Sequence, residues 1–277
     1  MTYFTPIAAR WHGTATWFAV LSLALAGTCF AGTTPPTAEA QRLNHLLART
    51  ADQTAGFLDQ FSDVKCTEQV RQEKLGKDDK VELKEDSSFD YLVILTNSGG
   101  DLSLSESRIP VHDAKRDRKN TSMLLSNGFA TLFLVFHPYY AQAFKFALAG
   151  EEVVAGRVLQ KVSFEHVPGM KSPAALALRG REYPLELSGT AWIDGQTGSI
   201  AKMEAGIADT LEDVGLKAFH AEIDFAPLPF SDAKLVYWFP TQARVEVETP
   251  RQHWRNLHQF TAYKKFSVST EQQVIKK

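Results

Sequence analysis

Cysteine is scarce in this chain, which has only Cys29 and Cys66 among its 277 residues. Cys29 lies in an N-terminal segment that we expect to be removed, so Cys66 would have no intramolecular partner. A fold held together by disulfides is therefore excluded. A nucleophilic role for Cys66 would need a histidine base nearby, and we interpret it instead as a small buried thiol.

Motifs for catalysis and metal binding are also missing. The sequence has no Gly-x-Ser-x-Gly elbow, no P-loop and no Gly-x-Gly-x-x-Gly stretch after a strand. Its eight histidines form no His-x-x-x-His pair, and there is no Cys-x-x-Cys motif. We predict no metal site, no cofactor, no catalytic residue and no enzyme activity. An exported hydrolase whose site assembles only in three dimensions stays open as a weaker alternative.

An excess of basic charge is absent. The 30 Lys and Arg residues against 32 Asp and Glu give a net charge of −2, so nucleic-acid binding, which needs a basic face, has no support. Basic residues do cluster between 115 and 119, within a segment of mixed charge that we interpret as a solvated loop. Any membrane contact would therefore be peripheral.

The N-terminus has the features of a secretory signal. Arg10 precedes an apolar run over 17–27, and no acidic residue occurs before Glu39. A positive start, an apolar stretch of about 7–15 residues and small residues near the cut define a cleavable signal. We expect cleavage after Ala31, so residues 1–31 are predicted to be a signal peptide and the protein to be periplasmic or secreted.

Two alternatives for this segment stay open. The apolar run is shorter than the roughly 20 residues that span a bilayer core, which disfavours a retained membrane helix. Lipidation of Cys29 usually requires a very small residue before the cysteine, and Thr28 stands there.

Two helices are predicted after a flexible leader at 32–40. Apolar residues between Leu43 and Phe61 fall on one face at helical spacing. The second helix is predicted over 122–136 and should end there, because Pro138 disfavours helix in the residue before it.

The rest of the chain has a hydrophobic period of two. Residues 219–225 and 244–248 alternate between apolar and polar side chains, as in an antiparallel sheet with one buried face. Asn97–Gly100 and Asp194–Ser199 have the composition of turns, and we also predict a hairpin loop at Glu151–Gly156.

Three stretches, 189–204, 238–245 and 258–268, resemble the periplasmic lipoprotein-carrier-like (LolA-like) superfamily. The first resembles a strand–(Asp-x-x-Thr-Gly)–strand hairpin, the second a strand containing Pro240, and the third a closing strand with an aromatic and basic pair. The resemblance implies an α+β, β-dominated fold over 41–268. This fold would be a single curved antiparallel sheet, a half-barrel, with two or more helices covering its concave face. Region 103–120 has no counterpart in that superfamily, and 269–277 is a polar tail.

The resemblance also implies a ligand, because members of the superfamily bind acyl chains or lipoproteins in the concavity. We predict an exported cell-envelope protein that binds a lipid or acyl chain; the alternative is a structural or interaction module with an envelope protein partner. The predicted lining residues are Phe129, Phe133, Phe164, Trp192, Met203, Phe219, Ile223, Phe225, Val245 and Val247.

Overall fold

The computed structural model describes residues 37–61, 64–98, 101–111, 132–178, 181–207, 209–211, 215–228 and 236–265. The predicted signal peptide, residues 32–36 of the predicted leader, and the C-terminal tail lie outside these ranges. So does the charged segment 112–120. Residues 38–40 were predicted as part of the flexible leader, but they belong to the helix that begins at Ala38, where Thr37 supplies the N-cap.

The described residues form one α-helix, twelve strands and three short 3₁₀ turns. The helix is α1 (Ala38–Phe61), and the turns are η1 (Lys77–Asp79), η2 (Leu134–Phe136) and η3 (Ala141–Ala143). The strands are β1 (Val64–Leu75), β2 (Val81–Ser98), β3 (Asp101–Pro110), β4 (Phe144–Val154), β5 (Arg157–His166), β6 (Ala175–Leu178), β7 (Arg181–Pro184), β8 (Leu187–Asp194), β9 (Ile200–Ile207), β10 (Ala218–Leu228), β11 (Tyr237–Glu248) and β12 (His253–Lys265).

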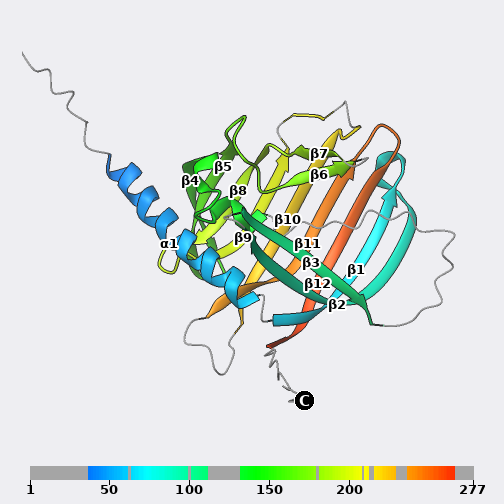
Figure 1. The fold of residues 1–277 in the computed structure, drawn as a ribbon, viewed down its shortest axis with the longest axis horizontal. Helices are drawn as coiled ribbons and strands as arrows, with labels where there is room; N and C mark the ends of the chain where they lie inside the picture. The colour runs from blue at the N-terminus through cyan, green and yellow to red at the C-terminus, as the bar shows by residue number, and fades with distance from the viewer. Residues whose placement is uncertain are drawn as a thin grey trace, which may run out of the picture. The chain divides into compact units, whose positions relative to one another are not determined.

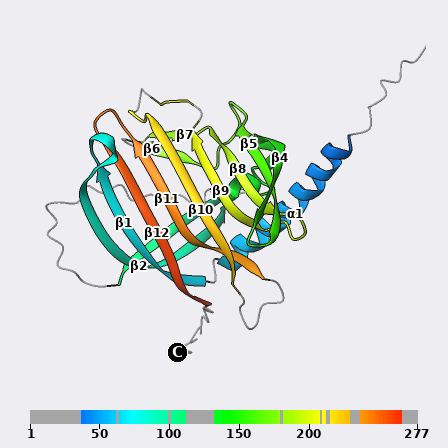
Figure 2. The ribbon, with the colours of Figure 1, turned by 180° about the vertical axis from the view of Figure 1, so that it is seen from behind.

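Ten of the strands form one open antiparallel sheet in the order β3-β2-β1-β12-β11-β10-β9-β8-β5-β4. Its edges, β3 and β4, do not pair, so the sheet does not close. Figure 1 shows that the sheet curves, with the β2–β3 hairpin crossing in front of the central strands; Figure 2 shows these central strands from behind. The β-dominated, antiparallel fold is thus confirmed, and β6 and β7 add a separate two-stranded ribbon.

The expectation of two or more helices is not borne out, because the described residues contain the single α-helix α1. Of the predicted second helix, residues 122–131 lie outside the described ranges. The remainder ends in the 3₁₀ turn η2, after which His137 is extended, with φ −68° and ψ 138°. Pro138 accounts for this ending, since the ring of a proline forces the preceding residue out of the helical region.

Two strand predictions also need correction. Glu151–Val154 belongs to β4 and not to a loop, because the turn needs only Ala155 and Gly156, with φ of 50° and 77°. Positive φ at both central residues is typical of the tight two-residue hairpin. The insertion predicted over 103–120 begins within strand β3, and every residue of β3 pairs with a residue of β2.

One face of the sheet, here called the inner face, is apolar along a row that crosses four strands. Ala191, Met203, Ile223 and Ala243 are partners in register from β8 to β11. None of the four is more than 5% exposed. Because side chains alternate between faces along a strand, this row fixes which residues of each strand face inward.

Helix α1 is attached closely to the turn between β8 and β9. The Arg49 guanidinium donates a hydrogen bond to the Gly195 carbonyl at 2.7 Å. Gly198 has φ +77°, and a Cβ built on it would lie 2.7 Å from the Arg49 carbonyl carbon. Only glycine therefore permits this approach of helix to turn. The helix begins at Ala38, where the Thr37 hydroxyl accepts a hydrogen bond from the Ala40 amide, as an N-cap does.

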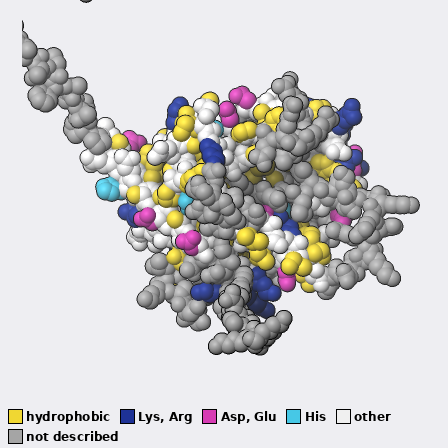
Figure 3. All heavy atoms as spheres, in the orientation of Figure 1, with side chains coloured by type: hydrophobic (Ala, Val, Ile, Leu, Met, Phe, Trp, Pro, Cys, Tyr) yellow, Lys and Arg dark blue, Asp and Glu magenta, His cyan; other side chains and the backbone are white. Residues whose placement is uncertain are grey.

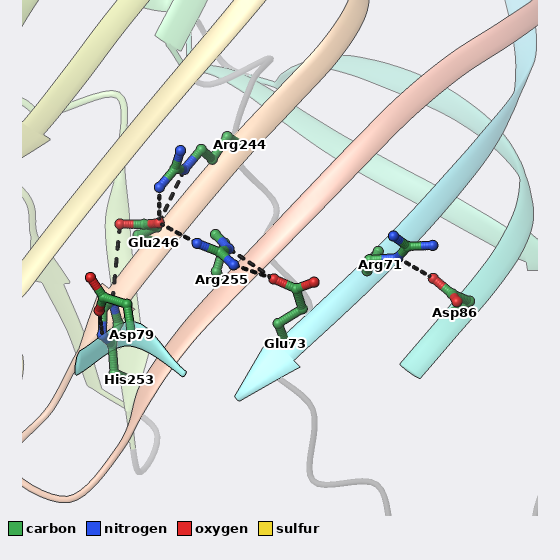
Figure 4. Close-up of polar contacts among 8 residues, drawn as sticks. All are labelled: Arg71, Glu73, Asp79, Asp86, Arg244, Glu246, His253 and Arg255. Carbon is green, nitrogen blue, oxygen red and sulfur yellow. Dashed lines mark hydrogen bonds and ion pairs between the residues drawn. The ribbon is translucent and has the colours of Figure 1, made fainter. Parts of the chain in front are cut away.

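The opposite, outer face carries pairs of opposite charge across neighbouring strands (Figure 4). Arg255 of β12 contacts Glu73 of β1 at 2.6 Å and Glu246 of β11 at 3.9 Å. Arg71 and Asp86 pair at 2.8 Å, although both side chains are about half exposed. Exposed pairs of this kind contribute at most about 1 kcal/mol each, so this face is held mainly by its backbone ladder.

Replacing Ile223 by Asp tests the burial of the inner face. We expect a loss of several kcal/mol in the free energy of unfolding, because an unpaired charge would be buried among apolar side chains. The matched control is Gln69→Asp, at an exposed position of β1, which has a neighbouring strand on each side. This change should alter stability by less than about 0.5 kcal/mol. Urea unfolding of both variants measures this, and equal midpoints would contradict the assignment of the face.

Candidate ligand site on the inner face of the sheet

Most of the lining residues predicted from the sequence lie in the core. Seven of them are buried: Phe133, Phe164, Trp192, Met203, Ile223, Phe225 and Val245. Phe219 and Val247 are partners in register and are half-buried. Phe129 lies outside the described residues. Burial alone does not separate a ligand-lining role from a purely structural one.

Trp192 lies on the other side of the sheet. It follows Ala191 of the inner row, so its indole is on the outer face between the ammonium groups of Lys161 and Lys202, which are 5.3 and 5.0 Å from the ring centroid. Its Nε1–H donates to Glu152 at 2.8 Å. A bulge between Trp192 and Ile193 interrupts the pairing with β9. Trp192 therefore makes cation–π contacts on the outer face, whereas the prediction placed it on the inner face with the other lining residues.

Aromatic rings fill the space between α1 and the sheet. Phe57 of α1 lies 4.7 Å from Phe133, which in turn lies 4.6 Å from Phe225 of β10. Phe61 of α1 contacts Phe239 of β11 at 5.5 Å. Such ring pairs add roughly 0.5–1.5 kcal/mol each beyond the area they bury. The C-terminal half of α1 is therefore a firm part of the core.

A second group of rings covers the inner face at the β4 edge. Phe136, Phe144, Phe146 and Phe164 contact one another with centroid distances of 5.2–6.3 Å. His166 ends this group, with its imidazole edge-on to Phe144 at 5.2 Å. We call these four phenylalanines and His166 the aromatic wall.

At the β3 end, the inner face carries buried charge. Glu68 of β1 accepts hydrogen bonds from the Arg108 guanidinium of β3, one of them at 2.9 Å, and its Oε1 lies 2.8 Å from Nδ1 of His258. Arg108 also contacts Glu106 at 3.0 Å. All four side chains are 5% exposed or less. Because β2 lies between β1 and β3, Arg108 reaches Glu68 by passing over the ring of Tyr91, 5.0 Å from its centroid.

The environment shifts the pKa values of this cluster in opposite directions. Burial favours the neutral form of Glu68, but hydrogen bonds from His258 and Arg108 outweigh it and hold the pKa of Glu68 below its usual value. Burial raises the pKa of Glu106, and the charge of Arg108 offsets this only in part. Burial also raises the pKa of the nearby Cys66 thiol to about 12, so this thiol is protonated at neutral pH and is a poor nucleophile.

Sequence reasoning missed this charged cluster. Arg108 and Glu106 lie in the segment that was interpreted as an insertion, so no inward direction could be assigned to them. Glu68 and His258 did leave a signal, because each occupies the apolar parity of its strand, beside Cys66 and Phe260 respectively. A charged residue at an inward position implies a buried partner, although it does not say which residue that partner is.

A small cavity lies between α1 and the β8–β9 turn. Its volume is about 20 Å³, and its lining includes Thr54, Phe133, Ser199 and Tyr237. The Thr54 hydroxyl is buried and has no hydrogen-bond partner. A cavity of this size holds about one water molecule, far less than the 300 Å³ or more that a ligand site needs.

Other kinds of site find no support in the part of the chain that the structure describes. No group of three or more His, Cys, Asp or Glu side chains is arranged to hold a metal ion. Within the same ranges, no helix has the length and apolar character required to cross a membrane.

Replacing Glu68 by Gln tests the charged cluster. We expect a loss of about 3–5 kcal/mol in unfolding free energy at pH 7, since Arg108 would be left without its main counter-ion. The pKa of Glu68 is lower in the folded protein than in the unfolded chain, where it is about 4.3. The ionised carboxylate therefore adds to the free energy of unfolding above pH 4.3, and this contribution is lost as the pH falls through the folded-state pKa. The variant should therefore lose less stability than the wild type between pH 4 and pH 2.

The matched control is Asp86→Asn, which breaks the exposed pair with Arg71 and should cost less than about 1 kcal/mol at pH 7. Urea unfolding at several pH values measures both variants. Similar small losses for the two would show that the cluster contributes no more than a surface pair.

No family model matches the chain, and no curated protein matches it. Among solved structures, the fold is similar to a DUF1329 family protein from Desulfovibrio piger, with 13% identity and a TM-score of 0.46 over 83% of this chain and 94% of that one. A LolA superfamily protein from Nitrosomonas europaea shows 9% identity and a TM-score of 0.38 over 82% and 94%. A putative outer membrane lipoprotein-sorting protein domain from Vibrio parahaemolyticus shows 11% and 0.41 over 81% and 94%.

At these identities and TM-scores the likeness concerns the fold alone. The LolA superfamily, to which the second of these proteins belongs, is the one that the sequence motifs resemble.

Proposed function

We propose that this chain is an exported cell-envelope protein that binds a hydrophobic ligand, a lipid or an acyl chain, on the inner face of its sheet and performs no chemistry on it. The observation that supports this most is the breadth of the apolar inner face, which runs from β5 to β11 through Val162, Met203, Ile223 and Val245. Among the described elements, one helix and short 3₁₀ turns pack against this face.

Apolar side chains that are only half-buried surround this core. Leu43 and Leu47 on α1 and Phe146 and Leu148 on β4 pack against the core while keeping part of their surface exposed. Figure 3 shows hydrophobic side chains reaching the surface among charged ones on the side of the molecule that carries α1. Phe146 belongs both to this rim and to the aromatic wall, so an apolar guest at the β4 edge would contact both.

The cavity between α1 and the β8–β9 turn, of about 20 Å³, is too small for an acyl chain, so a ligand at this place would require a covering element to move. The N-terminal half of α1 is the element best suited to this. It is mostly exposed and buries few side chains before Thr50. Its polar attachments are the Arg49–Gly195 hydrogen bond and an exposed contact of 4.0 Å between Arg42 and Glu151. Breaking these contacts costs little compared with unfolding the core.

The proposal is tested by native mass spectrometry of residues 32–277, purified from the periplasmic or secreted fraction, followed by lipid extraction. We expect an acyl-chain species bound at a near-stoichiometric level, because the apolar face gains by excluding water. The double variant Val153→Ser/Val158→Ser, altered only on an exposed hairpin, should carry the same species. A clean unliganded mass that takes up no fatty acid on addition would contradict lipid binding.

A second candidate function is an envelope interaction module with a protein partner. The β4–β5 hairpin supports it, because Val153 is 69% exposed, Val158 52% and Val154 44%. Val153 and Val158 are partners in register, so they form one apolar surface at the hairpin end. Exposed apolar surface of this kind is typical of an interaction site.

A photoreactive residue placed at Arg157 should form a cross-link to the partner in intact cells if the hairpin is the docking site. The double variant Val153→Ser/Val158→Ser should abolish this cross-link without lowering the melting temperature of the purified protein. The reason is that both valines are exposed and contribute to association rather than to the core. An unchanged cross-link would remove the support for this second function.

A further inference from the structure

We propose that His166 binds the polar end of the ligand, and that this ligand is a single-chain amphiphile with a hydroxyl head. The inference rests on the proposed function, because it assigns the head group of the molecule whose chain would lie on the inner face.

His166 is at the end of β5, and its side chain is 4% exposed. It has the same parity as Val162 and Phe164, so it faces inward, and it pairs with Phe144 at the start of β4. Although it is buried, neither Nδ1 nor Nε2 has a hydrogen-bond partner. Buried polar groups are nearly always bonded, and each exception requires an explanation.

The other buried histidine of the inner face provides a comparison. His258 is 3% exposed, and its Nδ1 lies 2.8 Å from Oε1 of Glu68. The fold therefore supplies a partner to one buried imidazole and supplies none to the other. A partner for His166 that arrives with the ligand explains this difference.

The surroundings of His166 restrict the chemistry of that partner. Its described ring contact is Phe144, which continues into Phe164 and Phe136 of the aromatic wall. A neutral imidazole offers one N–H donor and one acceptor nitrogen on opposite sides of its ring, so a hydroxyl group can accept from the first or donate to the second. A strongly charged head would be costly to bury against these rings. The alkyl chain of the amphiphile would lie along the wall.

A competition experiment tests this with decanol, decanoic acid and decane displacing an apolar fluorescent probe from the protein. For the wild type at pH 7 we expect decanol to bind about tenfold more tightly than decane, as one net hydrogen bond of about 1.4 kcal/mol would give. Decanoic acid is ionised at this pH and should show no such gain. In His166→Phe the preference should fall to within about twofold, while decane binds as before. The melting temperature of unliganded His166→Phe should be equal to or above that of the wild type, because a ring of similar shape replaces an unsatisfied polar group.

His258→Phe is the matched control. It should lower the melting temperature, because it removes a hydrogen-bond partner of Glu68, and it should keep the preference for decanol over decane. Retention of the tenfold preference in His166→Phe, or a clear fall in its melting temperature, would overturn the assignment of His166.

A second measurement uses the wild-type protein, so it does not depend on the folding of any variant. In spectra of side-chain ¹⁵N-histidine, decanol should shift the ring nitrogens of His166 and leave those of His258 in place, whereas decane should shift neither. Unmoved His166 nitrogens would overturn the inference.

In the competition experiment, failure of all three compounds to displace the probe would contradict the proposed function itself. Equal binding of decanol and decane by the wild type would overturn only the role of His166.

Discussion

Burial of the inner face is the constraint on which the rest of this structure depends. A ten-stranded open sheet presents a broad apolar face, and the row from Ala191 to Ala243 on it is almost completely buried. The sheet curves, and α1 with the turn after Phe133 packs against its inner side through stacked rings. The outer face needs no cover, because its charged side chains pair across strands in contact with water.

The charged cluster around Arg108 has a different role from the apolar half of the face. Arg108 connects edge strand β3 to Glu68 on β1 by passing over the strand between them, and His258 holds the same carboxylate from β12. Three strands, β3, β1 and β12, are thereby joined by side chains at this end of the sheet. Removing one member would leave a buried charge unpaired, which costs more than the complete cluster contributes.

The aromatic wall at the opposite end of the sheet combines strong packing with one unsatisfied group. Its phenylalanines bury their rings against each other, whereas His166 among them has no hydrogen-bond partner for either nitrogen. Stability would favour an apolar residue at this position. A binding role for His166 is thus consistent with the general finding that functional sites keep groups that the fold alone would not select.

The sequence by itself determined the local features of this protein. The apolar stripe of α1, the period of two in β10 and β11, and the turn at Asp194–Ser199 were all readable, because they depend on neighbouring residues. It also predicted the inward direction of Ile223, Met203 and Val245. The tertiary structure alone decided that Trp192 faces outward, that region 101–110 is the edge strand, and that Arg108 meets Glu68 forty residues away. Each of these depends on which strands become neighbours, and strand order is set by the burial of the whole face rather than by any local pattern.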